Sequence, residues 1–290
     1  YVDGKYVLYY SKSEWGGEWT CGLAVSVADK PEGPYTNPTK LFDSSEIGVQ
    51  NSIDPFFIEE DGHKYIFWGS FRGIYGIELS DDGMSVKAGA TKKKIAGTLT
   101  EGTYIIKHDG YYYLVGSAGS CCDGANSTYH LVVARSKNLF GPYVDRVGKS
   151  ALDNNFSSLL YRSSKVVGPG HCSEFIQDDA GQYWVLYHGY DASNISAGRK
   201  TYLDKVTWDE DGWPVIKEMR PSENGECEPP VIKTTAIEDI NADSAEKHGI
   251  HLSSHMVDDH LTITSERQEP FSWQVVTIHG EKWLSGKAQN

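Results

Sequence analysis

The sequence lacks long hydrophobic runs and an excess of positive charge. No apolar stretch approaches the roughly 18 residues that a membrane-spanning helix needs, and no amino-terminal signal peptide is visible. Lys and Arg together number 27 against 40 Asp and Glu, so the formal net charge is −13. Because nucleic-acid-binding proteins carry basic surfaces, this balance excludes nucleic acid as the expected partner. A neutral, hydroxyl-rich ligand suits such a surface better.

Cysteine is scarce and irregularly spaced. The five cysteines show no zinc-ligand spacing, and their odd number argues against a complete disulfide framework. Cys121 and Cys122 are adjacent in the chain, which is too close for an ordinary unstrained disulfide. We therefore expect this pair to be small buried residues in a tight loop. The five are Cys21, Cys121, Cys122, Cys172 and Cys227.

Aromatic residues and glycines are plentiful, and they recur in a repeat. The repeat consists of a glycine, one or two aromatic or polar residues, and an apolar segment that ends in a small residue. It begins at Gly4, Gly62, Gly110 and Gly181, and the last copy ends in His188 instead. Repeats of this kind, built from short alternating segments and Gly/Asp turns, are typical of the blades of a β-propeller.

A second shared element supports this interpretation, because residues 23–35 resemble residues 131–143 and both end in Gly-Pro-Tyr. The fold class is therefore all-β, and strands can be drafted for three blades. In the first repeat the leading strand is reduced to Tyr1-Val2. The drafted strands are 55–60, 64–69 and 74–79, then 103–107, 111–116 and 129–135, then 172–177, 183–188 and 201–208.

The sequence pattern changes near Pro221, and residues 231–290 contain no blade repeat. We predict a propeller domain over residues 1–220, and a linker with a partial, sandwich-like β region over residues 221–290. In the second region, residues 261–265 and 273–278 have the composition of strands.

Three ionisable residues occupy equivalent positions in three blades. Asp54, Glu101 and His171 lie eight, nine and ten residues before Gly62, Gly110 and Gly181. Taken singly, each could be a turn residue or a buried side chain whose hydrogen bonds are satisfied within the fold. Because the first strands of propeller blades surround one central channel, their shared register predicts that the three side chains converge there. Two carboxylates facing a sugar-sized channel are the groups that glycosidic-bond hydrolysis requires.

With these residues in view, the sequence resembles glycoside hydrolase family 43 and, within it, the arabinanases. The resemblance covers residues 1 to about 216 and implies a five-bladed β-propeller, of which about four blades are present here. It also implies hydrolysis of α-L-arabinosyl or β-D-xylosyl links with inversion of configuration. The segments that carry it are Asn51-Ser-Ile-Asp54-Pro55, Trp68-Gly-Ser-Phe-Arg-Gly-Ile74, Glu101-Gly-Thr-Tyr104, Cys121-Cys122, Ser127-Thr-Tyr129 and Gly168-Pro-Gly-His171.

The resemblance also implies roles for the three equivalent residues. Glu101 matches the general acid, and Asp54 matches the carboxylate that orients this acid and tunes its pKa. His171 matches an inner histidine that helps to hold a metal ion, commonly calcium through water, in the channel. The family's general base is an Asp upstream of the repeat that opens this chain, so we expect the base to be missing and the chain as given to be inactive.

Further residues match the expected sugar-binding positions of the family, although two departures from its pattern put the substrate in question. Thr103 stands where a Pro usually follows Glu-Gly, and Arg72 stands where arabinanases often have Trp. Phe71 is the best aromatic candidate for stacking on a sugar. The expected substrate-binding residues are Asn51, Ser70, Phe71, Cys121, Ser127 and Tyr129.

The leading hypothesis is therefore an inverting hydrolase of arabinan-type polysaccharide, a monomer that is secreted, periplasmic or attached to the cell surface. A xylan- or arabinoxylan-directed enzyme of the same family is an alternative, as is a non-catalytic carbohydrate-binding propeller. A protein-interaction propeller fits less well, because it would need no carboxylates at the channel. The sequence does not separate arabinan from xylan-type substrates, or endo from exo action.

Overall fold

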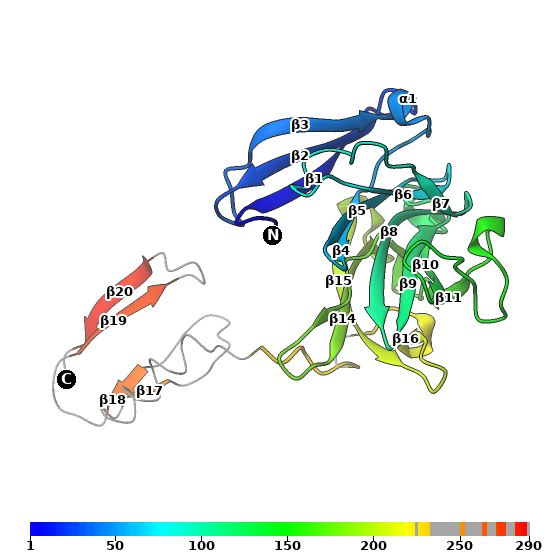
Figure 1. Cartoon of the computed structure of the whole chain (residues 1–290). Helices are drawn as coiled ribbons and strands as arrows, with labels where there is room; N and C mark the ends of the chain where they lie inside the picture. Colours follow the sequence, from blue (N-terminus) through cyan, green and yellow to red (C-terminus); the bar gives the residue numbers. More distant parts are fainter. Residues whose placement is uncertain (224–225, 233–249, 253–262, 266–270, 277–281, 289–290) are drawn as a thin grey trace. The chain divides into compact units, whose positions relative to one another are not determined.

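The computed structural model describes residues 1–223, 226–232, 250–252, 263–265, 271–276 and 282–288. The chain forms two compact units, Tyr1–Val231 and Ile232–Asn290. The first unit contains four antiparallel sheets, coloured from blue to yellow in Figure 1. Successive sheets come from successive stretches of the chain, as the sequence repeat predicted.

Three of these sheets have four or more strands, and the first has three. In each four-stranded path the strands neighbour one another in chain order, apart from β13, which pairs with β14 beside β12. The strands are β1 Tyr6–Lys12, β2 Gly22–Ala28 and β3 Thr36–Asp43; β4 Phe56–Glu60, β5 His63–Trp68, β6 Ile74–Glu78 and β7 Lys93–Ala96; β8 Thr100–His108, β9 Tyr111–Ala118, β10 His130–Ser136 and β11 Ser157–Leu160; and β12 Val166–Gly170, β13 Ile176–Gln177, β14 Tyr183–Asp191, β15 Arg199–Trp208 and β16 Pro214–Ile216.

Asp-Gly pairs make the turns that open three of the four repeats, and Ala180-Gly181 opens the fourth. Asp61 and Gly62 have φ of 53° and 78°, and Asp109 and Gly110 have φ of 45° and 73°. Two successive residues with positive φ form the turn whose twist matches that of an antiparallel hairpin, and Asp-Gly is a preferred sequence for it. The glycine at the start of each repeat therefore fixes where the first strand of a blade turns into the second.

The apolar cores lie between neighbouring sheets. Leu23 of β2 shares one cluster with Trp68 of β5, and Tyr113 of β9 shares another with Val185 of β14. A third cluster joins the second and third sheets. Because a middle sheet is covered on both faces, β9 is buried along nearly its whole length, without alternation of buried and exposed residues. This face-to-face stacking of successive sheets is the arrangement of a β-propeller, which confirms the predicted fold class.

One drafted strand differs from the structure. Residues 172–177 were predicted as the first strand of the last blade, but the fourth sheet begins with β12, and only β13 falls within that range. The segment between the two strands bends because His171 adopts a positive φ of 47°. The prediction was wrong here because strand periodicity does not reveal a single left-handed residue.

Short helices occupy the loops, and the second unit contains two small sheets. The helices are α1 Ser44–Ile47, η1 Gly124–Asn126, η2 Ala151–Asp153, η3 Ile195–Ala197 and η4 Lys217–Met219. In the second unit β17 Ile250–Leu252 pairs with β18 Ile263–Ser265, and β19 Phe271–Val276 pairs with β20 Lys282–Ala288. The predicted strands at 261–265 and 273–278 overlap β18 and β19. The domain boundary after residue 220 and the sandwich-like second region stay predictions.

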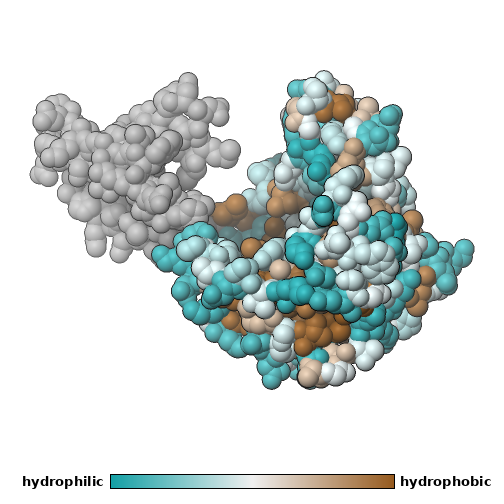
Figure 2. Space-filling model, turned by 90° about the horizontal axis from the view of Figure 1, so that it is seen from above, coloured by the Kyte–Doolittle hydropathy of each residue, from teal (hydrophilic) through white to brown (hydrophobic). Residues whose placement is uncertain are grey.

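The surface of the first unit carries no broad apolar face in the view of Figure 2, which shows teal and white residues with separate brown patches. Large exposed apolar side chains are scattered, and the most exposed is Trp15 in the loop between β1 and β2, at 97%. No helix in the described part of the chain is long and apolar enough to cross a membrane.

Candidate active site

The three predicted residues lie at the ends of the inner strands β4, β8 and β12, and there they come close together. We call this end of each sheet its head. Asp54 lies just before β4, Glu101 is the second residue of β8, and His171 follows β12 directly. The backbone N–H of Gly102 donates to Asp54 Oδ2 over 3.1 Å, so the heads of the second and third sheets are in contact. The ring of His171 lies against the same glycine, because a Cβ built on Gly102 would be 2.9 Å from that ring.

Serines near the ends of β1 and β9, the strands that follow a repeat glycine, bond to the residues at these positions. Ser11 Oγ accepts from the backbone N–H of Asp54 over 2.9 Å, and Ser117 Oγ accepts from that of His171 over 2.7 Å. Asp54 and His171 both have positive φ, of 59° and 47°, which L residues adopt at a cost. Each of these two strained residues is thus fixed by a serine of the preceding sheet.

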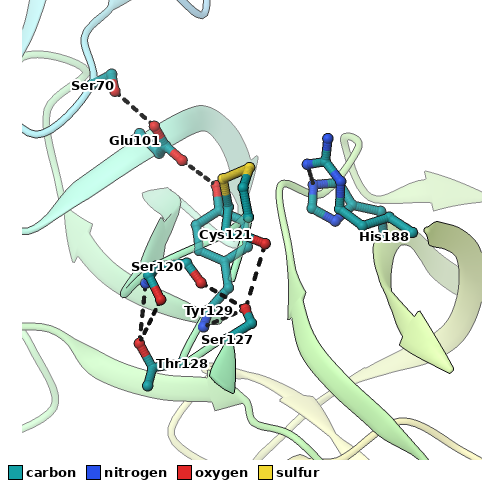
Figure 3. The surroundings of a disulfide bond; sticks show 10 residues. Ser70, Glu101, Ser120, Cys121, Ser127, Thr128, Tyr129 and His188 are labelled. Atoms are coloured by element: carbon teal, nitrogen blue, oxygen red, sulfur yellow. Dashed lines mark hydrogen bonds between the residues drawn. A yellow bond between two sulfur atoms is a disulfide. The ribbon is translucent and has the colours of Figure 1, made fainter. Parts of the chain in front are cut away.

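Glu101 is buried, with 9% of its surface exposed, and both of its oxygens accept hydrogen bonds. Ser70 Oγ donates to Oε2 and the Tyr129 hydroxyl donates to Oε1, each over 2.7 Å. Figure 3 shows the carboxyl group between these two donors. Both donors are neutral hydroxyl groups, so this arrangement holds the carboxyl group in one orientation.

Asp54 is the residue whose protonation the site perturbs. Burial raises its pKa, the nearby His171 opposes this, and the negative charge of Glu101 adds to the rise. The hydrogen bond from Gly102 N–H lowers the pKa by a smaller amount. Two carboxyl groups that influence each other at the mouth of a channel are the arrangement expected of a glycosidase acid with its partner.

A cavity of about 280 Å³ opens beside Asp54 and His171. All four sheets contribute to its lining, among them Ser11, Asp54, Tyr104 and His171. The predicted convergence of residues from separate blades is therefore present in the fold. Its size is sufficient for a small polar group or a single sugar unit but not for a long oligosaccharide.

The surroundings of His171 bear on its predicted role in holding a metal ion. Within the described residues there is no group of three or more His, Cys, Asp or Glu side chains that could hold a metal ion. Calcium takes six to eight oxygen ligands, so these side chains do not by themselves fit a directly bound calcium ion. Retention of calcium through water at His171 stays a prediction.

The loop that follows β9 carries a disulfide bond, which corrects the prediction of two small buried residues. Cys121 and Cys122 are joined to each other, with Cys121 half-buried and Cys122 exposed. Ser127 ends this loop, and its hydroxyl donates to the backbone oxygen of Ser120 over 2.6 Å (Figure 3). Ser127 Oγ also accepts from the N–H of Tyr129 over 3.4 Å, so the loop is tied to the tyrosine that contacts Glu101. The prediction failed because it relied on the usual Cα–Cα separation of disulfide-bonded cysteines, which is larger than the 3.8 Å between Cys121 and Cys122.

The remaining predicted residues surround Ser70. Asn51 Nδ2 donates to the backbone oxygen of Ser70 over 3.1 Å, and Phe71 is half-buried with a positive φ of 51°. Arg72 forms a two-bonded ion pair with Glu18, over 3.0 and 2.6 Å, and also donates to the backbone oxygen of Phe71. This pair joins the loop after β1 to the segment that holds the donor to Glu101.

Sequence reasoning missed His188, which faces Tyr129 in Figure 3. The two rings are 5.8 Å apart and nearly parallel at 17°, and the ring of His171 lies 6.1 Å from that of His188. Burial first, then Arg199 and His171, lower the pKa of His188 to about 4, so it is neutral at physiological pH. The signal was available, since His188 replaces the small residue at the end of the fourth repeat.

Comparison with known proteins identifies the family of this chain. The family described as glycosyl hydrolases family 43 matches residues 1–214. The chain belongs to glycosyl hydrolases family 43. The sequence resemblance to this family is thereby confirmed.

Among its family 43 relatives is the extracellular endo-α-(1→5)-L-arabinanase 1 of Bacillus subtilis, 34% identical over 222 residues, which are 74% of this chain and 66% of the relative. Another is the extracellular exo-α-(1→5)-L-arabinofuranosidase ArbA of Cellvibrio japonicus, 31% identical, with 74% and 67% covered. The solved structure of Cellvibrio cellulosa α-L-arabinanase with arabinohexaose aligns with a TM-score of 0.67 at 30% identity, covering 75% of each chain. The chain thus spans about two thirds of the length of these curated relatives.

Proposed function

We propose that this family 43 protein hydrolyses α-L-arabinofuranosyl links in arabinan, with Glu101 as the general acid. The observation that carries the proposal is the contact between Asp54 and the Glu101-Gly102 segment at the heads of two neighbouring inner strands. Relatives named as arabinanases and arabinofuranosidases supply the substrate class. Because two relatives are named extracellular, we extend the proposal to a secreted protein.

In this mechanism the protonated Glu101 transfers its proton to the glycosidic oxygen as the bond to the anomeric carbon breaks. Ser70 and Tyr129 hold the carboxyl group in one orientation, so that the proton points to one position in the cleft. Inversion requires a second carboxylate, roughly 6.5–9.5 Å from the acid, that activates water on the opposite face of the sugar. We assign that base to none of the described residues.

The test is release of reducing sugar from linear arabinan, debranched arabinan and xylan by the wild-type protein, extended upstream through the blade that carries the expected base, and by its Glu101→Gln variant. Loss of the general acid is expected to lower the rate on arabinan by about 10²–10⁴-fold. The matched control is Glu59→Gln, because Glu59 is an exposed glutamate of β4 that lies outside the site. Its activity should equal that of the wild type.

Other outcomes would redirect the assignment. Release from xylan but not from arabinan would replace the substrate with a xylan-type one. Wild-type protein that binds arabinan and releases no sugar would favour the non-catalytic carbohydrate-binding propeller. A Glu101→Gln variant with wild-type activity would overturn the assignment of the acid.

A further inference from the structure

Arg72 departs from the family pattern, and a tryptophan in its place would lack the contacts that it makes here. Its Nε and Nη2 donate to the two carboxylate oxygens of Glu18 over 3.0 and 2.6 Å, and its Nη1 donates to the backbone oxygen of Phe71 over 3.0 Å. The Arg72 side chain is 43% exposed, and ion pairs at such positions contribute little to stability. A guanidinium group bonded to both oxygens of one carboxylate is nevertheless fixed in orientation. The pair therefore serves to place its neighbours rather than to stabilise the fold.

These contacts close a ring of hydrogen bonds around Ser70. The backbone N–H of Asn51 donates to the backbone oxygen of Glu18 over 2.7 Å, and Asn51 Nδ2 donates to the backbone oxygen of Ser70 over 3.1 Å. Ser70 and Phe71 are consecutive in the chain, and Phe71 is bonded to Arg72, which returns to Glu18. Because the ring is closed, each member is held from two sides, and loss of the Arg72–Glu18 pair would open it.

The ring holds two residues in strained backbone conformations. Asn51 and Phe71 have positive φ of 52° and 51°, which L residues adopt at a cost. The N–H of Phe71 donates to the backbone oxygen of Thr100 over 3.0 Å, and its carbonyl oxygen accepts from Arg72. Both peptide groups that flank Phe71 are thus bonded, so the chain on either side of it has little freedom to rotate.

Ser70 carries the effect of the ring to the acid. It is buried, with 2% of its surface exposed, and its hydroxyl donates to Glu101 Oε2 over 2.7 Å. We propose that Arg72, with Glu18, is a positioning residue for the general acid and acts by holding Ser70 against Glu101. This inference rests on the proposed function, because it takes Glu101 to be the acid. Proton transfer needs the acid within hydrogen-bond reach of the glycosidic oxygen, and a misplacement of about 1 Å lowers rates by up to about 10²-fold.

The first measurement is the kinetics of Arg72→Met on linear arabinan, in the protein extended upstream through the blade that carries the expected base. Methionine keeps an unbranched side chain and removes all three bonds. We expect kcat to fall about tenfold and KM to change by less than about twofold, because the substrate still binds and the proton is delivered less well. The matched control is Arg146→Met, at an ion pair with Asp209 of similar exposure, and it should keep the wild-type kcat.

A second substrate separates an effect on the acid from a general structural loss. Dinitrophenyl arabinosides of one and three sugar units release a phenolate that needs no proton, so their cleavage does not depend on the general acid. The loss caused by Arg72→Met should therefore disappear on these substrates. Glu101→Gln calibrates them, because its loss on arabinan should be mostly absent as well. Equal losses of Arg72→Met on arabinan and on the dinitrophenyl arabinosides would overturn the inference.

A double-substitution cycle tests whether the effect runs through Ser70. Ser70→Ala removes the donor to Glu101 and should itself lower kcat on arabinan. If Arg72 acts through Ser70, adding Arg72→Met to Ser70→Ala should lower kcat no further. Glu18→Gln combined with Arg72→Met should likewise equal Arg72→Met alone, since both break the same link. Independent effects of Ser70→Ala and Arg72→Met, multiplying in the double variant, would contradict the proposal.

Amide hydrogen exchange gives a readout that does not need activity and uses the chain as it stands. The N–H of Phe71 is bonded to Thr100 and belongs to a residue of the ring, so opening the ring should expose it more often. We expect Arg72→Met to speed exchange at Phe71 about tenfold, the value of one hydrogen bond, and Arg146→Met to leave it unchanged. Wild-type exchange at Phe71 in Arg72→Met would overturn the inference.

Failure of the proposed function looks different from failure of this inference. Extended wild-type protein that cleaves neither arabinan nor xylan removes the hydrolase assignment, and exchange at Phe71 still decides whether the ring holds Ser70. Active wild-type protein whose Arg72→Met variant keeps its kcat and its exchange at Phe71 removes this inference alone.

Discussion

Asp54 is the residue at which function and stability oppose each other. It combines a left-handed backbone conformation with a carboxyl group whose pKa is raised by burial. A raised folded-state pKa means that folding disfavours the ionised form. The stability that Asp54 contributes is therefore complete below its unfolded pKa, near 3.8, and is lost as the pH rises through its folded pKa.

The raised pKa of Asp54 in the folded state gives a prediction for Asp54→Asn. The variant should match the wild type in thermal stability near pH 3.5 and exceed it increasingly toward pH 7, while losing activity on arabinan. The measurement is the melting temperature between pH 3.5 and pH 7. A constant difference over that range would contradict the argument.

Asp191 provides a control because its pKa is shifted in the opposite direction to that of Asp54. Hydrogen bonds from Ser193 and the ion pair with Lys200 lower its pKa, so its contribution is present above the unfolded pKa and lost in acid. Asp191→Asn should therefore be less stable than the wild type at pH 7 and approach it as the pH falls.

At the scale of the element, the inner strand β12 depends on a glycine that faces the disulfide loop. A Cβ on Gly168 would lie 2.1 Å from the hydroxyl of Ser127, and Gly168 has φ of 60°. Gly168→Ala should cost about 1–2 kcal/mol for the left-handed backbone and about 1–3 kcal/mol more for overpacking. Chemical denaturation would measure the sum.

The matched control is Gly181→Ala at the turn before β14. Gly181 has φ of 78° but nothing within 4 Å of its Cβ position, so only the backbone cost applies. Equal destabilisation by the two substitutions would show that Ser127 moves aside freely. Ser127→Gly combined with Gly168→Ala should recover the packing part of the loss.

The elements also show what could be read from the sequence. The glycine-initiated repeat predicted β5, β9 and β14, because turn glycines and apolar runs are local signals. The register of Asp54, Glu101 and His171 predicted their convergence, because equivalent positions in blades face one channel. The bonds from Ser70 and Tyr129 to Glu101 were not predictable. They join residues of different strands, or of neighbouring sheets, whose side-chain directions no local pattern specifies.

The same limit explains two further gaps. The pairing of Glu18 with Arg72 spans two sheets, and Arg72 was noticed only as a departure from the family pattern. The roles of Asn51, Phe71 and Cys121 in sugar binding stay predictions, since the structure gives their positions and no ligand. For Ser70 and Tyr129 the structure adds a specific contact, because both donate a hydrogen bond to Glu101.

At the scale of the whole molecule, the segment after residue 220 packs onto the fourth sheet. The N–H of Ser222 donates to the buried Asp204, and Val231 bonds to the β13–β14 turn through Asp178 and Asp179. A fragment ending at residue 231 keeps these bonds, whereas one ending at residue 220 loses the Ser222 donor and leaves Asp204 with the Tyr187 hydroxyl as its donor.

We therefore expect residues 1–220 to melt about 3–10 °C below residues 1–231, since losing a hydrogen bond to a buried charge costs about 1.5–3 kcal/mol. Calorimetry of the two fragments, with the full chain as reference, is the measurement. Identical melting temperatures would mean that the segment contributes nothing to the fold.

The serine contacts between sheets also have a direction. Each runs from a blade to the one that follows it in the chain, so an error in one blade displaces the functional residue of its successor and not its own. Rearranging the order in which the blades are encoded, as in circular permutation, would preserve every such neighbour. Duplicating or deleting one blade would instead give a serine the wrong partner. Propellers of this kind should therefore tolerate permutation in evolution better than a change in blade number.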